Sequence, residues 1–482
     1  MNPIRRFLKR GQHEWTFVSV VIAVSLLLGW LLLPTYPFSH DGMAWIRYIT
    51  IHQIHHESGH PTYFYVMWMI EAIIQWIHPV SIITLVNGVT IASSIGASLA
   101  IGWAIFEWGL WNGVRIRWGA LLPFLLFTPY LLLFNHTIEV YSMGVALGMA
   151  GVAAYFRSLH QHQWAFLCLS GVCMALSFGC SVTVIFVWLW LGGVTLFFSL
   201  PWSTKVSYMG ALAGMVLLGV VALFASLYWL GLVHYQGLNE WVQFMSGGGG
   251  GIMTNSLSNT IQKWIMMGLL MGPLWILGWR AFTVSVANQL GIGWRLGWGI
   301  CVMMMGIFAS MNLVASAEQL VIGAALLLIT TWPLTQDWVA KYRLDWGMWI
   351  VGLVGCMVLG MVFNRKSHAV EAVLGYLQQH PSPLVLSQSF VTYIPMATPS
   401  RSVAIYGPEL EQLKRDHPNV VVIEVDALLP LFVKPDEIGT KQRIPVKTLP
   451  FEDMLKGWIP LPLSWGPIYC VTLRPLSKTS PP

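Results

Sequence analysis

Long apolar stretches recur along the first three quarters of this chain of 482 residues, and polar residues gather in the short segments between them. A helix needs about 20 apolar residues to cross the hydrocarbon core of a bilayer. On that criterion the predicted spans are residues 15–33, 82–106, 119–135, 138–156, 164–180, 183–200, 207–232, 261–279, 295–314, 318–335 and 346–363. The pattern therefore predicts a polytopic α-helical membrane protein with about 11 transmembrane helices.

The apolar stretch at residues 63–77 differs from these spans in its length and its polar content. It follows Pro61, contains Glu71 and is followed by His78. A segment this short suits a helix that lies at the membrane interface, or re-enters from one side, better than a complete crossing. We therefore leave it out of the predicted spans.

The placement of lysine and arginine tests that choice, because the cytoplasmic loops of membrane proteins collect these residues. If residues 63–77 do not cross, the cations on one face are Arg5, Arg6, Lys9, Arg10, Arg115, Arg117, Arg157, Lys205, Arg280, Arg295, Lys341 and Arg343. The short loops on the opposite face then carry only Arg47 and Lys263. This asymmetry predicts a cytoplasmic N-terminus and an extracytoplasmic tail.

The tail differs from the rest of the chain in composition, since half of the 20 acidic residues lie from Glu371 onward. Its predicted strands are residues 384–386, 402–406, 420–425 and 468–473, and its predicted helices are residues 368–379 and 409–415. Alternating strands and helices favour a small α/β domain. We predict a transmembrane domain over residues 1–363 and an extracytoplasmic α/β domain over residues 364–482.

Composition agrees with the membrane class and argues against two others. Only 10% of the residues are charged, whereas soluble proteins carry about 25%. The net charge of +6 does not indicate a nucleic-acid partner, because the cations are spread over the predicted inner loops rather than gathered in one patch. Five of the six cysteines lie in apolar runs, so no disulfide framework is expected.

The first outer loop, residues 34–61, concentrates titratable side chains more than any other segment. These are His40, Asp41, His52, His55, His56, Glu57 and His60. Ionisable groups beside a membrane are costly unless they pair or line a wet cavity, so this cluster is a candidate functional site. Asp41 and Glu139 are the sharpest candidates, because each is an isolated acid next to apolar sequence. The alternative is that the loop side chains are merely solvated among the lipid headgroups.

Residues 56–60 match H-E-x-x-H, the pattern in which two histidines bind zinc and the glutamate serves as a base. The pattern requires a helix through His60. Pro61 disfavours the helical conformation at the residue before it, and Gly59 weakens the helix further. We therefore favour a chance match, although the loop histidines leave room for a divalent metal bound in a looser arrangement. No other cofactor is predicted.

Three short stretches follow one another along the chain. They are residues 39–42 (SHDG) together with 59–65 (GHPTYFY), then residues 135–141 (NHTIEVY), then residues 175–179 (ALSFG). In their order they resemble GT-C-type integral membrane glycosyltransferases. More narrowly, they resemble a bacterial family related to protein O-mannosyltransferases, which has an acidic first outer loop, a His-Pro-x-Tyr-type segment and a later Glu-Val-Tyr.

This resemblance implies an inverting glycosyltransferase of the bacterial plasma (inner) membrane. It implies a sugar donor linked to a polyprenyl phosphate and an acceptor at the outer face. In the family the acid of the first outer loop acts as the catalytic base or orients the acceptor, which assigns that role to Asp41 and makes Glu139 a second carboxylate of the same site. The expected substrate-binding residues are His40, Arg47, Glu57, His60, Tyr63 and Lys263.

Two other functions stay open. His40 stands where the family commonly has a second acid, which favours a non-catalytic relative that scaffolds other membrane proteins. The number of predicted spans also fits a transporter or flippase of lipid-linked sugar. Transporters usually place their polar groups at mid-membrane on broken helices, whereas here the acids cluster at one face. Nothing in the sequence specifies the sugar, the acceptor or the oligomeric state.

Overall fold

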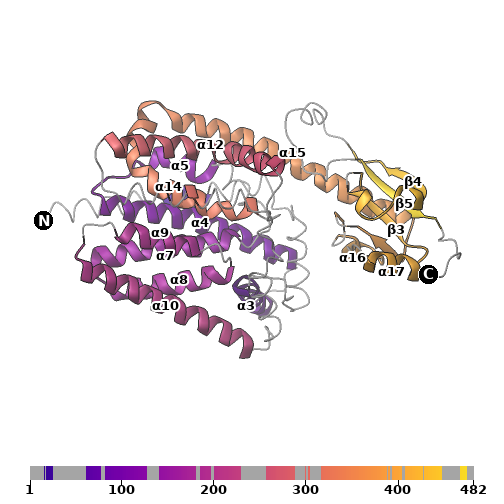
Figure 1. The fold of residues 1–482 in the computed structure, drawn as a ribbon, viewed down its shortest axis with the longest axis horizontal. Coiled ribbons are helices and arrows are strands. Elements are labelled where there is room, and N and C mark those ends of the chain that lie inside the picture. Colours follow the sequence, from indigo (N-terminus) through magenta and orange to yellow (C-terminus); the bar gives the residue numbers. More distant parts are fainter. Residues whose placement is uncertain are drawn as a thin grey trace. The chain divides into compact units, whose positions relative to one another are not determined.

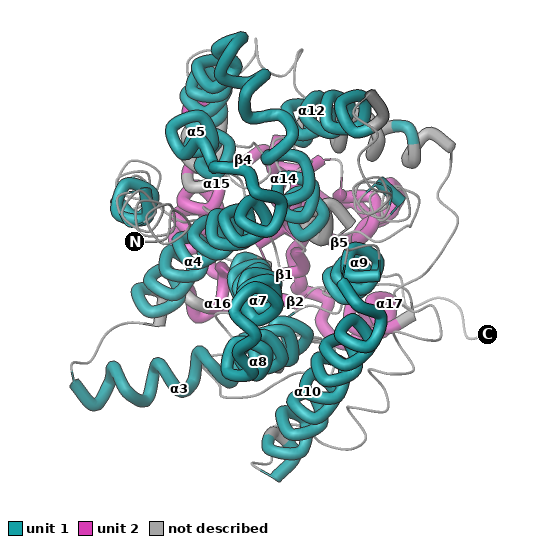
Figure 2. The backbone as a smooth tube through the Cα atoms, turned by 90° about the vertical axis from the view of Figure 1, so that its left-hand side faces the viewer, with its two compact units in different colours: residues 1–35, 48–356 teal, residues 36–47, 357–482 magenta. Residues whose placement is uncertain are grey.

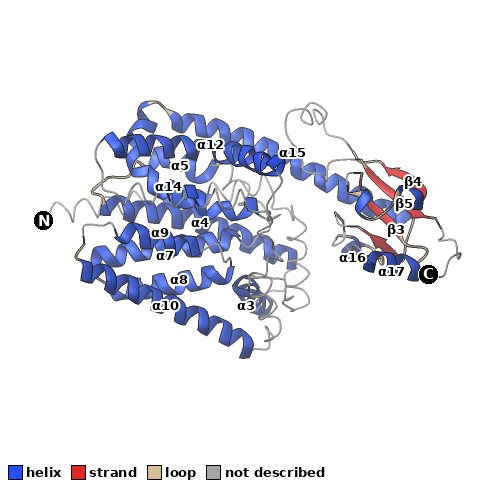
Figure 3. Ribbon diagram, viewed as in Figure 1, coloured by secondary structure: helices blue, strands red, loops and turns tan. Residues whose placement is uncertain are grey.

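In a computed structural model of the chain, the described residues are mostly helical, and a small β-sheet lies in the C-terminal part (Figures 1 and 3). The structure describes residues 16, 18–24, 61–77, 82–127, 141–180, 185–196, 200–229, 257–287, 299, 302–303, 316–387, 389–390, 393–403, 408–426, 428–447 and 467–474. The described residues form two compact units, one up to Cys356 and one from Met357 onward (Figure 2).

The first unit is a bundle of helices. They are α3 (Pro61–Ile77), α4 (Ile82–Trp111), α5 (Trp118–Phe127), α7 (Tyr141–Gln161), α8 (Trp164–Cys180), α9 (Ile185–Leu196), α10 (Trp202–Trp229), α12 (Leu257–Ala287), α14 (Ser316–Lys341) and the first part of α15 (Leu344–Gln379). Among the described helices, the segments Thr84–Trp111 and Trp202–Ser226 are long and apolar enough to cross a membrane. The count of 11 spans stays a prediction, because several of them fall largely outside the described residues.

Large apolar side chains point away from the protein on two of the long helices. On α10 these are Val206, Leu217, Leu218, Val221 and Trp229, and on α15 they are Trp346, Ile350, Leu353, Val354 and Met357. Soluble proteins rarely expose apolar patches of this extent. The surface of the bundle is therefore the kind that lipid tails solvate.

Helix α8 packs closely against α10 along a ridge of small residues on α8. The residues on α8 are Gly171, Ala175 and Gly179, and those facing them on α10 are Met215, Gly219 and Leu223. A Cβ atom on Gly171 would lie only 2.6 Å from Met215 Cβ. Small residues four positions apart let two helices pack backbone against backbone, which is typical of membrane bundles.

Replacing Gly219 with leucine is expected to destabilise the bundle by about 1–3 kcal/mol, because overpacked interiors force shifts of backbone and side chains. A Cβ atom at this position already lies 2.7 Å from Ala175 Cβ. The measurement is the thermal unfolding midpoint of the detergent-solubilised protein. Gly214→Leu on the same helix is the matched control, since a Cβ there meets no atom within 4 Å. Equal midpoints for the two variants would contradict the close packing of α8 against α10.

A buried ion pair joins α4 to α7. The Glu107 side chain is 3% exposed, and its Oε1 atom accepts hydrogen bonds from Arg157 Nη1 at 3.2 Å and from Trp103 Nε1 at 3.0 Å. The Arg157 guanidinium also lies 4.8 Å from the centre of the Phe166 ring. An enclosed pair of this kind holds the two helices in one register, because sliding either helix would leave a buried charge without its partner.

The second unit contains a sheet of mixed direction. Its strands are β1 (Leu384–Leu386), β2 (Arg401–Val403), β3 (Val421–Val425), β4 (Ile438–Ile444) and β5 (Ile468–Leu473), in the order β2-β1-β3-β5-β4. β1 pairs in parallel with β2 and β3, and β5 pairs antiparallel with β3 and β4. The helical elements are the end of α15, α16 (Ile394–Ala397), α17 (Pro408–Asp416) and the short 3-10 turns Leu429–Leu431 and Pro435–Glu437. The end of α15 packs on the sheet through Val373 and Leu377, and α17 packs through Leu410.

The structure corrects the sequence prediction in the tail. The predicted span 346–363 and the predicted helix 368–379 are one continuous helix, α15, because no proline interrupts residues 344–379. Strand β4 was not predicted, because the five successive residues between Ile438 and Ile444 are exposed and are polar or glycine. Strands β1 and β5 have the predicted bounds. Strand β2 begins one residue earlier than expected, and residues 404–406 of that prediction lie outside the described residues.

Candidate functional site

Most residues of the predicted site lie outside the part of the chain that the structure describes. These are His40, Asp41, Arg47, Glu57, His60 and Glu139. Lys263 belongs to α12, and its side chain is also outside the described set. Tyr63 is described and lies in the first turn of α3. The structure therefore gives the helical framework to which the predicted site residues are attached.

Helix α3 begins at Pro61, one residue after His60. Proline suits the first position of a helix, because its missing N–H would have no partner within the helix there. The following side chains, Thr62, Tyr63 and Phe64, are fully or almost fully buried, and the rings of Tyr63 and Phe64 meet edge-on with centroids 5.7 Å apart. The start of α3 is therefore anchored in the bundle.

The course of α3 differs from that of the long helices around it. Figure 1 shows α4, α7, α8 and α10 along their lengths and α3 nearly end-on, whereas Figure 2 shows α3 along its length. Its later turns expose the apolar side chains Met69, Ile73 and Trp76. A helix that runs across the bundle and exposes apolar side chains agrees with the interfacial or re-entrant position expected for this segment.

Three helices meet at the first turn of α3. A Cβ atom on Gly179, near the end of α8, would collide with the Thr62 side chain and would lie 2.7 Å from Leu223 Cδ2 of α10. On the same stretch of α8, Ser177 Oγ donates a hydrogen bond of 2.6 Å to the carbonyl oxygen of Gly144, in the first turn of α7. The starts of α3 and α7 and the end of α8 therefore lie at one end of the bundle.

The helix ends that meet here belong to the same sequence stretches that carry the family resemblance. The described portions of these stretches are residues 61–65, Tyr141 and residues 175–179. Asp41 and Glu139 themselves remain predictions. Sequence reasoning singled out Gly179 only through the resemblance and missed its contact with Thr62. The spacing of Gly171, Ala175 and Gly179 was the signal that could have revealed a packing ridge.

The polar groups at this end of the bundle include a buried hydroxyl. Thr62 is fully buried, and its Oγ1 atom has no hydrogen-bond partner in the part of the chain that the structure describes. Within the described ranges, no three His, Cys, Asp or Glu side chains gather closely enough to hold a metal ion. The loop histidines considered for a divalent metal are not among those residues.

The bundle, the crosswise α3 and the C-terminal sheet together have the fold of GT-C-type integral membrane glycosyltransferases, which confirms the predicted resemblance at the level of the fold. The crystal structure of ArnT from Cupriavidus metallidurans bound to undecaprenyl phosphate matches with a TM-score of 0.58 at 10% identity, over 97% of this chain and 99% of that one. ArnT in the apo state matches with a TM-score of 0.56 at 12% identity, over 95% and 98% of the two chains.

A third match is the oligosaccharyltransferase from Archaeoglobus fulgidus tethered with an acceptor peptide, with a TM-score of 0.51 at 10% identity, over 90% of this chain and 73% of that one. No protein-family model and no curated protein matches the sequence. The narrower resemblance to relatives of protein O-mannosyltransferases stays a prediction.

Proposed function

We propose that this protein is a glycosyltransferase that moves a sugar from a polyprenyl-phosphate-linked donor to an acceptor at the outer face of the bacterial plasma membrane. The observation that carries the proposal is the match to ArnT over nearly the full length of both chains. Because that ArnT structure is bound to undecaprenyl phosphate, we assign a polyprenyl phosphate as the lipid that leaves when the sugar is transferred.

The chemistry requires a base near the acceptor and positive or hydrogen-bonding groups near the leaving phosphate. An acceptor oxygen attacks the anomeric carbon, the bond from that carbon to the phosphate oxygen breaks, and the acceptor proton passes to the base. We assign the base to Asp41 and a second carboxylate to Glu139, with inversion at the anomeric carbon. The remaining polar residues proposed to bind the donor or the acceptor are His40, Arg47, Glu57, His60, Tyr63 and Lys263.

The described framework supports bringing two of these segments together. Glu139 precedes the first residue of α7 by two positions, so covalent geometry keeps its Cα atom within about 7 Å of that helix start. His60 is bonded directly to Pro61 at the start of α3. Both helix starts lie at the same end of the bundle, where Ser177 and Gly179 of α8 contact them.

The proposal also fixes a topology, with the N-terminus in the cytoplasm and residues 364–482 outside. Reporter fusions after Arg117, Arg157 and Arg343 are expected to read as cytoplasmic, because these arginines follow the asymmetry of cytoplasmic loops. A fusion after Gln379 is expected to read as external. An external signal from the fusion after Arg117 would mean that the later loops lie on the opposite faces from those predicted. Glu139 would then lie on the cytoplasmic face, which would contradict its assignment to the site.

Photo-crosslinking with a polyprenyl phosphate analogue tests the donor assignment directly. We expect the label to attach in peptides that contain the first outer loop or the start of α3, and unlabelled polyprenyl phosphate to compete for it. A phospholipid probe that carries the same photoreactive group is the control for general lipid contact. Labelling that polyprenyl phosphate does not compete would contradict a specific donor site.

A further inference from the structure

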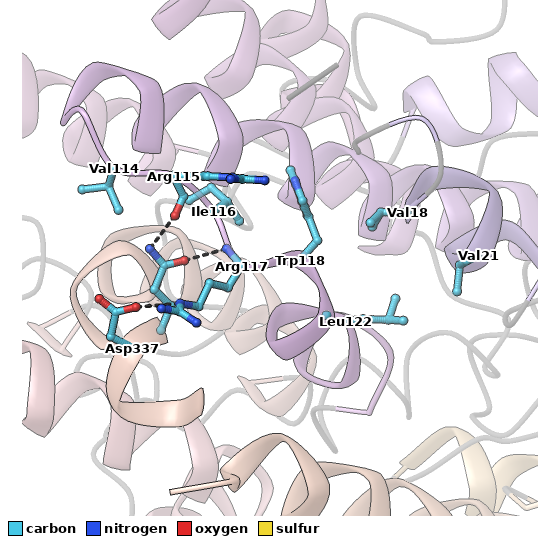
Figure 4. Close-up of a pocket in the computed structure, with 11 residues that line it drawn as sticks. Val18, Val21, Val114, Arg115, Ile116, Arg117, Trp118, Leu122 and Asp337 are labelled. Atoms are coloured by element: carbon cyan, nitrogen blue, oxygen red, sulfur yellow. Dashed lines mark hydrogen bonds and ion pairs between the residues drawn. The ribbon is translucent and has the colours of Figure 1, made fainter. Parts of the chain in front are cut away.

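The bundle has a cavity far from the start of α3. Helix α4 begins near α3 and extends for 30 residues, which is about 45 Å. Beyond its far end, the turn into α5 lines a cavity of about 920 Å³, together with the N-terminal segment 18–24 and α14 (Figure 4). A volume of this size is within the range of small-molecule sites.

One wall of the cavity is a backbone segment held by a buried amide. Gln336 of α14 is 3% exposed. Its Nε2 atom donates a hydrogen bond of 2.8 Å to the carbonyl oxygen of Arg115, and its Oε1 atom accepts one of 2.8 Å from the backbone N–H of Arg117. Figure 4 shows both hydrogen bonds. The positions from which the two arginine side chains leave the backbone are therefore fixed before any ligand binds.

The charged residues that line the cavity, in the part of the chain that the structure describes, are two arginines and one acid. Arg115 and Arg117 are both exposed, and the facing acid is Asp337, whose Oδ1 atom accepts a hydrogen bond of 2.7 Å from Arg117 Nε. The Asp337 side chain is 79% exposed, so water screens this pair and an incoming anion can share the guanidinium. Arginine is well suited to such sharing, because it presents five N–H donors in a planar fork.

The other walls of the cavity are apolar. Val18 and Val21 come from the N-terminal segment, and Leu122 comes from α5. Gly119, on the first turn of α5, also lines the cavity, and a Cβ atom added to it meets no atom within 4 Å. The cavity thus places a cationic rim beside an apolar wall, an arrangement complementary to a molecule with an anionic head and a hydrocarbon chain.

We propose that this cavity binds an anionic phospholipid of the cytoplasmic leaflet. The phosphodiester lies against Arg115 and Arg117, and an acyl chain lies along Val18, Val21 and Leu122. The position of the site agrees, because the cation asymmetry of the chain assigns the turn between α4 and α5 to the cytoplasmic face, and basic pockets between helices on that side attract anionic head groups. A free phosphate ion would leave the apolar wall unused.

Native mass spectrometry of the detergent-solubilised full chain tests this site with two defined lipids, dioleoyl phosphatidylglycerol and dioleoyl phosphatidylcholine. We expect phosphatidylglycerol to bind in preference to phosphatidylcholine. The double variant Arg115→Gln/Arg117→Gln is expected to weaken phosphatidylglycerol binding about tenfold, since each cation near an anionic lipid contributes substantially to its binding. Arg343→Gln removes an exposed arginine that does not line the cavity and is expected to leave binding unchanged.

A second variant tests the cavity without changing its charge. Gly119→Leu fills the open space beside the apolar wall, and leucine is a better helix former than glycine, so α5 is expected to stay folded. Weaker phosphatidylglycerol binding in this variant, at an unchanged unfolding midpoint, is the expected result. The proposal would be overturned by equal binding of the two lipids, by equal loss in Arg343→Gln, or by displacement of the lipid with millimolar inorganic phosphate, which would indicate a phosphate site instead.

Discussion

Replacing Asp41 with asparagine is expected to lower sugar transfer in membranes by about 100-fold or more. Asparagine keeps the size of the side chain and removes its charge, so the protein should fold while the acceptor proton loses its base. Glu139→Gln is expected to cost less if that carboxylate only orients the acceptor. The measurement is the initial rate of transfer, normalised to the amount of folded protein in the membrane.

His56→Ala separates this proposal from metal-dependent chemistry. It removes the first histidine of the H-E-x-x-H pattern, so it would abolish an activity that depends on a zinc ion bound there. Under the glycosyltransferase proposal its effect should be small. Full activity in Asp41→Asn together with no activity in His56→Ala would overturn the assignment of Asp41 as the base.

The second large effect is expected at the buried ion pair between α4 and α7. Glu107→Ala should destabilise the protein by about 3–5 kcal/mol, because it leaves the Arg157 charge in a largely enclosed place without its partner. The Arg157 side chain is 27% exposed, so the lower end of that range is the better expectation. The measurement is the free energy of unfolding of the solubilised protein in denaturant.

Two comparisons make this expectation specific. Asp337→Ala removes the acid of the exposed Arg117–Asp337 pair, whose side chains are 58% and 79% exposed, and should cost at most about 1 kcal/mol. The double variant Glu107→Ala/Arg157→Ala should be less destabilised than Glu107→Ala alone, because it leaves no unpaired charge. Equal losses in Glu107→Ala and Asp337→Ala would show that the buried pair does not hold the register of the two helices.

The sequence predicted the helices of the bundle well, because lipid requires long uninterrupted apolar runs. The run at residues 164–180 became α8 with the same bounds, and the run at residues 207–232 lies largely in α10. The short, proline-led segment at residues 63–77 forms α3, and the course of α3 across the bundle agrees with leaving this segment out of the predicted spans. Length and hydropathy were enough for these elements.

Other features depend on contacts between distant residues, which an apolar run does not encode. In the sequence prediction Arg115 and Arg117 served only as cytoplasmic charges. Nothing in their own segment indicates that the side-chain amide of Gln336, from α14, hydrogen-bonds to their backbone. Glu107 and Arg157 are 50 residues apart, so their pairing follows from the packing of α4 on α7 rather than from local sequence. For the proposed site, the candidate residues come from the sequence alone. The structure adds the positions of the starts of α3 and α7, to which the segments with His60 and Glu139 are attached.

The most direct test of the proposed function is the release of free polyprenyl phosphate from a polyprenyl-phosphate-linked sugar by the purified full chain in vesicles that contain acceptor lipids or peptides. The proposal predicts that wild-type protein releases polyprenyl phosphate in step with the appearance of glycosylated acceptor, and that Asp41→Asn does both about 100-fold more slowly or worse. A transporter would move the intact donor between leaflets without cleaving it, and a scaffold would leave it unchanged. Intact donor after incubation with folded wild-type protein, across the polyprenyl-linked sugars and acceptors of its own membranes, would contradict the proposal.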